Sequence, residues 1–383
     1  MVYDESMKIP RFYANLSQYL EPNKVLVIYG ARQVGKTTLL QDFLTQTDFK
    51  YKLDSGDNIK TQQILSSQDF KQIIEYVSGY ELIAIDEAQR IPNIGMGLKI
   101  IVDQVPQIKV VATGSSSFEL SGQIGEPLTG RKTTLTLFPI AQIELSKLHN
   151  RYELKEKLPE YLVFGSYPTV LTAKSKQKKT AILEEIINAY LLKDVLELER
   201  VKGSKILIDL LRLLAFQIGS EVSLTELGMK LGIDYKTVAR YINLLEKAFV
   251  LYTVSGFSRN LRKEITKKNK YYFYDNGIRN AIISNFNDLE VRDDIGKLWE
   301  NFLVTERLKI QKYQGIYANN YFWRTWEHQE IDWLEEREGE IYAYEFKWKS
   351  GQAKAPDEFI KSYSRAIFQT INQDNYLDFL GIT

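Results

Sequence analysis

Residues 25–40 read VLVIYGARQVGKTTLL, and the rest of the chain is organised around them. The apolar run from Val25 to Tyr29 predicts a buried strand that ends at Gly30. The residues that follow fit the pattern G-x-x-x-x-G-K-[ST], in which backbone N–H groups surround a polyphosphate. An ordinary glycine-rich turn is the competing interpretation. The candidate binding residues are Gly30, Ala31, Arg32, Gln33, Val34, Gly35, Lys36, Thr37 and Thr38.

Each part of this pattern has a chemical task. The glycines let the backbone curl around phosphate oxygens, and the helix expected from Lys36 directs its positive end toward them. The Lys36 ammonium is expected to reach the β and γ oxygens, and the Thr37 hydroxyl is expected to bind Mg²⁺. The predicted cofactors are therefore a nucleoside triphosphate and Mg²⁺.

Composition limits the remaining possibilities. The chain has 383 residues, which suggests two or three domains, and 44% of them are hydrophobic. The formal net charge is +1, so any contact with nucleic acid must come from a local patch. There is no cysteine, which excludes disulfides and thiolate sites. Without a signal peptide or an apolar run of membrane length, we expect a cytoplasmic protein with no membrane segment.

A second motif lies about fifty residues further along the chain, where ELIAIDE ends a short apolar run in two carboxylates. This is the Walker B pattern. Asp86 is expected to hold the Mg²⁺ shell, and Glu87 to polarise the water that attacks the γ-phosphate. Many strands also end in acidic turns, but the pairing with the phosphate loop favours the functional interpretation.

A third strand is expected at 108–114, followed by small hydroxyl residues. Thr113 and Ser115 are candidates to sense the γ-phosphate, although a simple Gly/Ser loop would look the same. The helix expected within 88–107 separates two strands, which predicts a parallel sheet with right-handed crossovers. Arg131 could stabilise charge on a transferring phosphoryl group, or could form a surface salt bridge.

The middle of the chain has helix-turn-helix spacing. We expect helices at 206–216 and from Ser223, a turn at 232–234, and a second amphipathic helix from Asp234. Strand-like runs at 249–254 and 270–274 then flank a basic loop that resembles a wing. DNA contact and protein docking are both open for this segment. The candidate DNA contacts are Lys236, Arg240 and Asn243 in the helix and Arg259, Arg262 and Lys263 in the loop.

Near the C-terminus, EIDWL and IYAYEFKW predict a hairpin. Asp332 and Glu345 would then project to one place, with Lys347 on the same strand face as Glu345. Two carboxylates can hold Mg²⁺ against a scissile phosphate while a lysine stabilises charge. The pattern E-x-K also arises readily by chance, so the alternative is a solvated strand face.

The motifs GARQVGKTT, LIAIDEAQ, ATGSSS and LTGRKTTLTLFP, in this order, resemble the prokaryotic AAA-type ATPases that carry a winged-helix segment and a restriction-endonuclease-like C-terminal domain. The resemblance implies an α/β P-loop domain at 1–145, a helical linker at 146–205, a winged helix at 206–285 and a small nuclease-like α/β domain at 286–383. It also implies ATP as the nucleotide. Glu300 matches the acidic position that such nucleases often carry upstream. Whether Arg131 acts in its own chain or on a neighbouring subunit of a homo-oligomer is left open.

Three hypotheses follow. The first is a Mg²⁺-dependent ATPase that repositions a DNA-binding module. The second is an ATP-gated nuclease with its chemistry at Asp332, Glu345 and Lys347. The third is a nucleotide-switched protein scaffold that scarcely turns over.

Overall fold

The structure is a computed structural model of the chain, and it describes residues 8–114, 127–191, 204–257, 268–325, 327 and 329–383. Ser115, Arg259, Arg262 and Lys263 lie outside these residues. The chain divides into two compact units. The first unit comprises 11–139 with the short segment 247–249, and the second comprises 140–246 and 250–383 together with the residues before 11.

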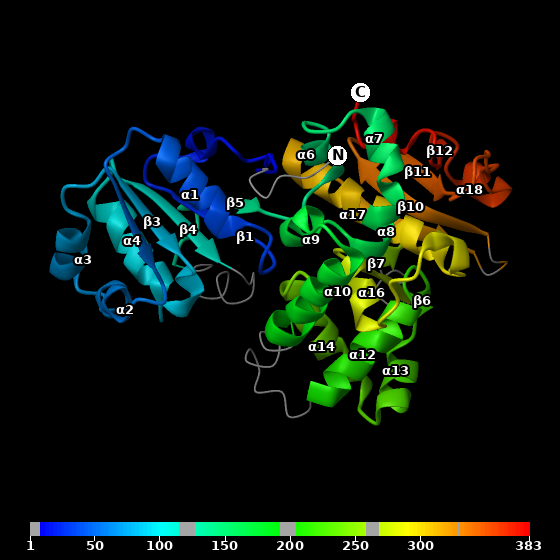
Figure 1. Cartoon of the computed structure of the whole chain (residues 1–383), viewed down its shortest axis with the longest axis horizontal. Helices are drawn as coiled ribbons and strands as arrows, with labels where there is room; N and C mark the ends of the chain where they lie inside the picture. Colours follow the sequence, from blue (N-terminus) through cyan, green and yellow to red (C-terminus); the bar gives the residue numbers. More distant parts are fainter. Residues whose placement is uncertain (1–7, 115–126, 192–203, 258–267, 326, 328) are drawn as a thin grey trace. The chain divides into compact units, whose positions relative to one another are not determined.

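The first unit is built on a five-stranded parallel sheet (Figure 1). Strands are β1 (Val25–Tyr29), β2 (Tyr51–Ser55), β3 (Leu82–Asp86), β4 (Lys109–Gly114) and β5 (Lys132–Thr136), in the spatial order β2-β3-β4-β1-β5. The expected parallel sheet is confirmed, since every neighbouring pair is parallel. All five residues of β1 are buried, as a strand covered on both faces requires.

The connections of the first unit are short helices with identifiable starts. They are η1 (Leu16–Tyr19), α1 (Lys36–Gln46), α2 (Ile59–Ser66), α3 (Phe70–Val77), η2 (Ala88–Arg90) and α4 (Ile94–Gln104). The side chains of Asn58 and Asp69 accept hydrogen bonds from backbone N–H groups in the first turns of α2 and α3. The spacing of Phe12, Leu16 and Leu20 suggests a longer helix, but only the 3₁₀ turn η1 forms there.

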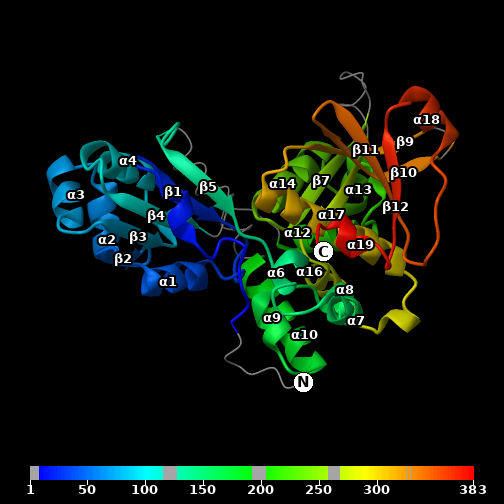
Figure 2. The ribbon, with the colours of Figure 1, turned by 90° about the horizontal axis from the view of Figure 1, so that it is seen from above.

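The second unit contains a seven-stranded mixed sheet that crosses two of the expected domains. Its strands are β6 (Glu221–Val222), β7 (Leu251–Gly256), β8 (Asn269–Phe273), β9 (Asn319–Arg324), β10 (Glu330–Arg337), β11 (Glu340–Phe346) and β12 (Ile367–Ile371). The order is β12-β11-β10-β9-β7-β8-β6. Figure 2 shows β9, β10, β11 and β12 close together in this unit. Strand β7 pairs in parallel with β9, with Ser255 opposite Tyr321. The expected hairpin β7–β8 and the expected nuclease-like strands therefore form one continuous sheet.

Helices pack around this sheet. They are α6 (Gln142–Leu145), α7 (Arg151–Glu156), α8 (Leu158–Phe164), α9 (Pro168–Thr172), α10 (Lys176–Glu185), the π-helical turn η3 (Ile186–Leu191), α12 (Ser204–Phe216), α13 (Leu224–Leu231), α14 (Tyr235–Lys247), α16 (Asn276–Ile282), η4 (Leu289–Val291), α17 (Ile295–Gln314), α18 (Asp357–Ser362) and α19 (Tyr376–Phe379). Helices α12, α13 and α14 lie where they were expected. Ser223 caps α13 through a hydrogen bond from the Glu226 N–H.

The basic run 174–179 departs from expectation. Its charge suggests a solvated loop, but Ser175 caps α10 and the following lysines form the first turns of that helix. Lys179 is buried and forms an ion pair with Glu160, while Lys176 forms one with Asp288. Lys176 and Lys179 are therefore compensated by acidic partners 112 and 19 positions away, which a local charge pattern does not reveal.

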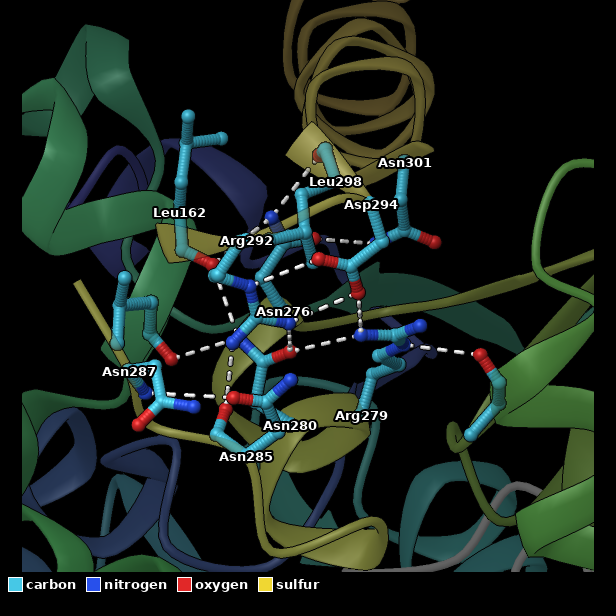
Figure 3. A network of polar contacts seen from close by, with 12 residues as sticks. Leu162, Asn276, Arg279, Asn280, Asn285, Asn287, Arg292, Asp294, Leu298 and Asn301 are labelled. Carbon is cyan, nitrogen blue, oxygen red and sulfur yellow. Dashed lines mark hydrogen bonds and ion pairs between the residues drawn. The ribbon is translucent and has the colours of Figure 1, made fainter. Parts of the chain in front are cut away.

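A buried polar network joins α8, α16 and α17 (Figure 3). The Asn280 side chain donates to the carbonyls of Leu162 and Val163. Arg279 and Arg292 both contact the Asp294 carboxylate. Because each polar group has a partner, the network holds these helices in one arrangement without leaving unpaired buried groups.

The same network attaches α17 to β8. The Phe273 N–H donates to Asn301 Oδ1 at 2.8 Å, and Asn301 Nδ2 donates to the Phe273 carbonyl at 3.0 Å and to Asn276 Oδ1 at 2.6 Å. Asn301 is fully buried. One amide side chain therefore sets the position of β8 against α17.

Among the residues described, none of the helices combines the length and the apolar character needed to cross a bilayer.

Replacing Asn301 by leucine leaves the Phe273 N–H and carbonyl without this partner. We expect the free energy of unfolding of the second unit to fall by about 2 to 4 kcal/mol. All five tryptophans lie between residues 299 and 348, so tryptophan fluorescence during urea unfolding reports this unit selectively. The exposed Asn243→Ala variant is the control and should change the midpoint little. An unchanged midpoint for Asn301→Leu would contradict the role given to the amide.

Candidate functional site

The phosphate loop connects the end of β1 to the start of α1, as the sequence predicts. Gly35, with φ of 94°, is the N-cap residue of α1, a conformation that glycine adopts without strain. The Lys36 ammonium is buried and donates to the carbonyls of Gly30 at 3.0 Å and Ala31 at 2.7 Å. The loop thus curls around its own lysine. Phosphate oxygens of a bound nucleotide can replace the two carbonyls as partners of the Lys36 ammonium.

The Walker B strand lies within contact of this loop. The Thr37 hydroxyl donates to Asp86 Oδ2 at 2.8 Å. A hydroxyl and a carboxylate oxygen are ligands that Mg²⁺ prefers. Strand β4 lies between β1 and β3, so the end of β4 is placed between the phosphate loop and the Walker B residues.

Thr113 fills that intermediate position. It is fully buried, its hydroxyl donates to Asp86 Oδ1, and it accepts a hydrogen bond from the Glu87 N–H at 3.2 Å. It is one of the two residues predicted to sense the γ-phosphate at this strand end. The other, Ser115, lies outside the described residues.

Glu87 occupies an uncommon backbone conformation, with φ of 51°. The Gly56 N–H donates to the Asp86 carbonyl at 2.7 Å, and a Cβ at Gly56 would lie 2.1 Å from the Glu87 carbonyl oxygen. Gln89 Nε2 donates to Glu87 Oε2 at 2.6 Å. Gly56 therefore holds the backbone of the turn after β3, and Gln89 holds the Glu87 carboxylate.

Arg131 lies at the amino ends of the strands, opposite to the ends that carry the phosphate loop. Its carbonyl accepts a hydrogen bond from the N–H of Val25, which is the first residue of β1. The phosphate loop, by contrast, follows Tyr29, the last residue of β1. Five strand residues separate the two ends, or about 15 Å. Arg131 Nε donates to Asp103 Oδ1 at 2.6 Å, so the residue forms the salt bridge that the sequence left open as an alternative. Arg131 does not reach the phosphate loop of its own chain, and a role on a neighbouring copy stays a prediction.

In α14, the three predicted DNA-contact residues Lys236, Arg240 and Asn243 are all exposed. Their spacing of four and three residues places them on one face of the helix. The helix begins after Asp234, whose carboxylate accepts from the N–H groups of Lys236 and Thr237.

The four predicted nuclease-site residues come together in the second unit. Asp332 on β10 lies opposite Glu345 on β11, because Trp333 pairs with Tyr344 in the antiparallel hairpin. Lys347 Nζ donates to Glu345 Oε1 at 2.6 Å. Glu300, on α17, accepts from the Tyr272 hydroxyl at 2.6 Å. We call this group the carboxylate centre; it comprises Glu300, Glu330, Asp332 and Glu345 with Lys270 and Lys347.

The electrostatics of the carboxylate centre are dominated by burial and by mutual repulsion. Burial, with the nearby charges of Glu300 and Glu345, raises the pKa of Asp332 well above its usual range. Burial also raises the pKa of Glu345. Burial alone would lower the pKa of Lys270, but the surrounding carboxylates raise it above its ordinary value.

The carboxylate centre does not fit a divalent metal as it stands. The Lys270 ammonium lies 3.2 Å from Glu300 Oε1 and 2.5 Å from Glu330 Oε1, so a cation is already supplied by the chain. Within the part of the chain that the structure describes, no three acidic, histidine or cysteine side chains form a metal-binding group. The phosphate loop differs, since Thr37 and Asp86 present oxygens and the carbonyl partners of Lys36 are exchangeable.

Comparison with known proteins shows which families parts of the chain are similar to. Residues 22–146 match the family model of an AAA domain. The first unit therefore resembles an AAA-type P-loop ATPase domain. Residues 155–289 and 295–375 match two domains of unknown function, DUF8612 and DUF4143.

Similarity over most of the chain is found with uncharacterised proteins. One, from Mycobacterium tuberculosis, is 28% identical over 344 residues, covering 87% of this chain and 72% of that protein. Another, from Methanocaldococcus jannaschii, is 24% identical over 370 residues, covering 91% and 80%. An uncharacterised ATP-binding protein of Pyrococcus horikoshii is 32% identical over 74 residues, or 19% of this chain and 22% of that protein. Among solved structures, a Walker-type ATPase of Pyrococcus abyssi has a TM-score of 0.49 at 13% identity, covering 74% of this chain and 100% of that one.

The sequence analysis did not identify several residues that the structure brings to these two places. They are Gly56 and Gln89 beside Glu87, and Lys270, Tyr272 and Glu330 in the carboxylate centre. Gln89 lies two residues after Glu87 and could have been proposed from that proximity. For Lys270 the only local signal is a lysine that opens the otherwise apolar run KYYFY.

Replacing Gly56 by alanine introduces a methyl group 2.1 Å from the Glu87 carbonyl oxygen, so the turn that carries Glu87 must move. We expect ATP turnover to fall by about 10- to 100-fold, because small displacements of reacting groups are costly. The matched control is Gly296→Ala, where nothing lies within 4 Å of the added carbon. Turnover measured by phosphate release should separate the two variants. Equal activity would show that the approach of Gly56 does not position Glu87.

Proposed function

We propose that the protein is a Mg²⁺-dependent ATPase whose nucleotide state controls the second unit, with DNA as its partner. The observation that carries the proposal is the contact of Thr37 with Asp86, beside the buried Lys36 and the Thr113-supported Glu87. Two motifs separated by about fifty residues thus meet at the carboxyl edge of one parallel sheet, which is where ligands bind in such sheets.

The residues divide the work as follows. Bound Mg²⁺·ATP supplies the γ-phosphoryl group and a Lewis acid that spreads its negative charge. Lys36 would exchange its loop carbonyls for phosphate oxygens, and Thr37 and Asp86 would hold the metal. Glu87 accepts a proton from the attacking water. Gln89 positions the Glu87 carboxylate, and Thr113 ties that residue to Asp86.

DNA contact by α14 is the second element of the proposal. Lys236, Arg240 and Asn243 form an exposed polar face at the helix that follows the turn, which is the position of a recognition helix. Lysine and arginine on such a face bind phosphates and make affinity depend on salt. A docking module for protein is the alternative, and a lack of duplex binding at low salt would favour it.

Cleavage of DNA is not part of the proposed function. The predicted nuclease residues Asp332, Glu345 and Lys347 lie together, but Lys270 provides the positive charge that a metal would otherwise bring.

Replacing Glu87 by glutamine removes the proton acceptor but keeps the shape of the side chain. We expect ATP turnover to fall by at least about 100-fold while affinity for ATP changes little, since Glu87 is assigned to chemistry and not to binding. Phosphate release measures the first quantity, and titration with a fluorescent ATP analogue measures the second. Lys36→Ala is the contrasting variant and should lose binding itself. Persistent hydrolysis in Glu87→Gln would refute the assigned base.

The double variant Lys236→Ala and Arg240→Ala removes two cations from the proposed DNA face. We expect weaker duplex binding and a salt dependence that is shallower by about one unit of slope for each lost phosphate contact. Fluorescence anisotropy between low and moderate salt gives both values. Lys230→Ala is the matched control, because Lys230 is exposed on α13 and paired with Glu226. An unchanged slope in the double variant would show that Lys236 and Arg240 do not contact DNA.

A further inference from the structure

Lys270 is the least expected member of the carboxylate centre. Its side chain is 1% exposed, although it carries a charge. A lysine is almost never buried to this extent unless it is paired. Its partners are Glu300 from α17 and Glu330 from β10, at 3.2 and 2.5 Å. The ammonium therefore bridges two carboxylates from different elements.

The other carboxylates are satisfied only in part, because Glu345 Oε2 is buried and has no hydrogen-bond partner among the described residues. Glu300 also accepts from the Tyr272 hydroxyl, and Asp332 Oδ2 accepts from the Phe346 N–H at 2.8 Å. Glu345 is paired with Lys347, and Glu330 also lies 3.9 Å from the Arg324 guanidinium. The centre thus combines carboxylates with cations supplied wholly by the chain.

The position of Lys270 is set by its backbone. Strand β8 lies between β7 and β6, so Lys270 has a strand neighbour on each side, Val254 and Glu221. Asn301 then fixes β8 to α17 through Phe273. Because β8 is paired on both sides, the backbone of Lys270 is fixed and its side chain stays in the carboxylate centre. A lysine on the surface would instead change its side-chain conformation freely.

We propose that the Lys270 ammonium stands in place of the divalent cation, so that the carboxylate centre is a metal-free charged junction joining β8, α17 and β10. The physical reason is charge: the Lys270 ammonium pairs directly with Glu300 and Glu330 and also interacts electrostatically with Asp332. A divalent cation bound by these carboxylates would lie close to a fixed positive charge, and like charges at short range in a buried site repel strongly. The centre therefore supports the second unit and does not cleave phosphodiesters.

The wild-type protein gives the first test, with Tb³⁺ alone as the probe and no nucleotide present. Trp299 and Trp348 adjoin Glu300 and Lys347 in sequence, and their rings lie 5.6 Å apart. Because the first unit contains no tryptophan, tryptophan-sensitised Tb³⁺ emission reports the second unit. We expect wild type and Asp332→Asn to give the same emission. Saturable emission in wild type that disappears in Asp332→Asn would overturn the proposal, and this comparison requires no change at Lys270.

Removing the ammonium gives the second test. We expect Lys270→Met to bind Tb³⁺ at least about tenfold more tightly than wild type, with the gain lost on adding Asp332→Asn and competed by Mg²⁺. Lys270→Arg keeps the charge and should show no gain. Circular dichroism identifies whether Lys270→Met is folded, and a folded variant without new binding would contradict the proposal. The result is independent of ATP hydrolysis, so it stands or falls separately from the proposed function.

DNA cleavage is the third readout. Wild type should leave supercoiled plasmid intact with Mg²⁺ or Mn²⁺, with and without ATP. Cutting by wild type that Asp332→Asn abolishes would overturn the proposal, because it would require a working metal centre at this place.

Discussion

A charged side chain withdrawn from water must meet an opposite charge or a set of polar groups, and much of this structure follows from that constraint. Lys36 meets two loop carbonyls, Lys270 meets two carboxylates, and Arg307 makes a two-point contact with Glu335 at 2.5 and 2.9 Å. The pairings of Lys270 and Arg307 add charged contacts between elements that are distant in sequence. The buried charges therefore specify which elements lie against one another.

The partners of a buried lysine determine what its site can do. Neutral carbonyls hold the Lys36 ammonium by hydrogen bonds, and a triphosphate offers that ammonium a stronger interaction than they do. Carboxylates hold Lys270 by full charges, and a metal ion bound by these carboxylates would lie close to its fixed positive charge. The first arrangement is open to exchange with a ligand, whereas the second is a stable part of the fold. The functions proposed above therefore assign Lys36 to nucleotide binding and Lys270 to support of the fold.

Local patterns predicted a large part of the fold because the signals involved are short in range. The apolar runs of β1, β3 and β4 are buried strands, and the hairpin of β10 and β11 follows its alternating residues. The same hairpin brings Asp332 and Glu345 together, whereas Glu300 joins them from α17 through tertiary packing. The role of Arg131 could not be assigned in this way, since its motif does not tell at which end of the strands the residue lies. The pairing of β7 with β9 also joins residues more than sixty positions apart, beyond any local period.

The sequence by itself determined the phosphate loop, the Walker B carboxylates and the strands that carry them, because these depend on backbone conformation and on burial within a few residues. Only the tertiary structure decided that Thr113 supports Asp86 and Glu87, that Gln89 contacts the Glu87 carboxylate, and that Lys270 lies among acidic side chains. The physical reason is that the charge state and the chemistry of a group depend on its neighbours in space. Strand order and sheet pairing determine those neighbours, and the spacing of a motif predicts neither of them.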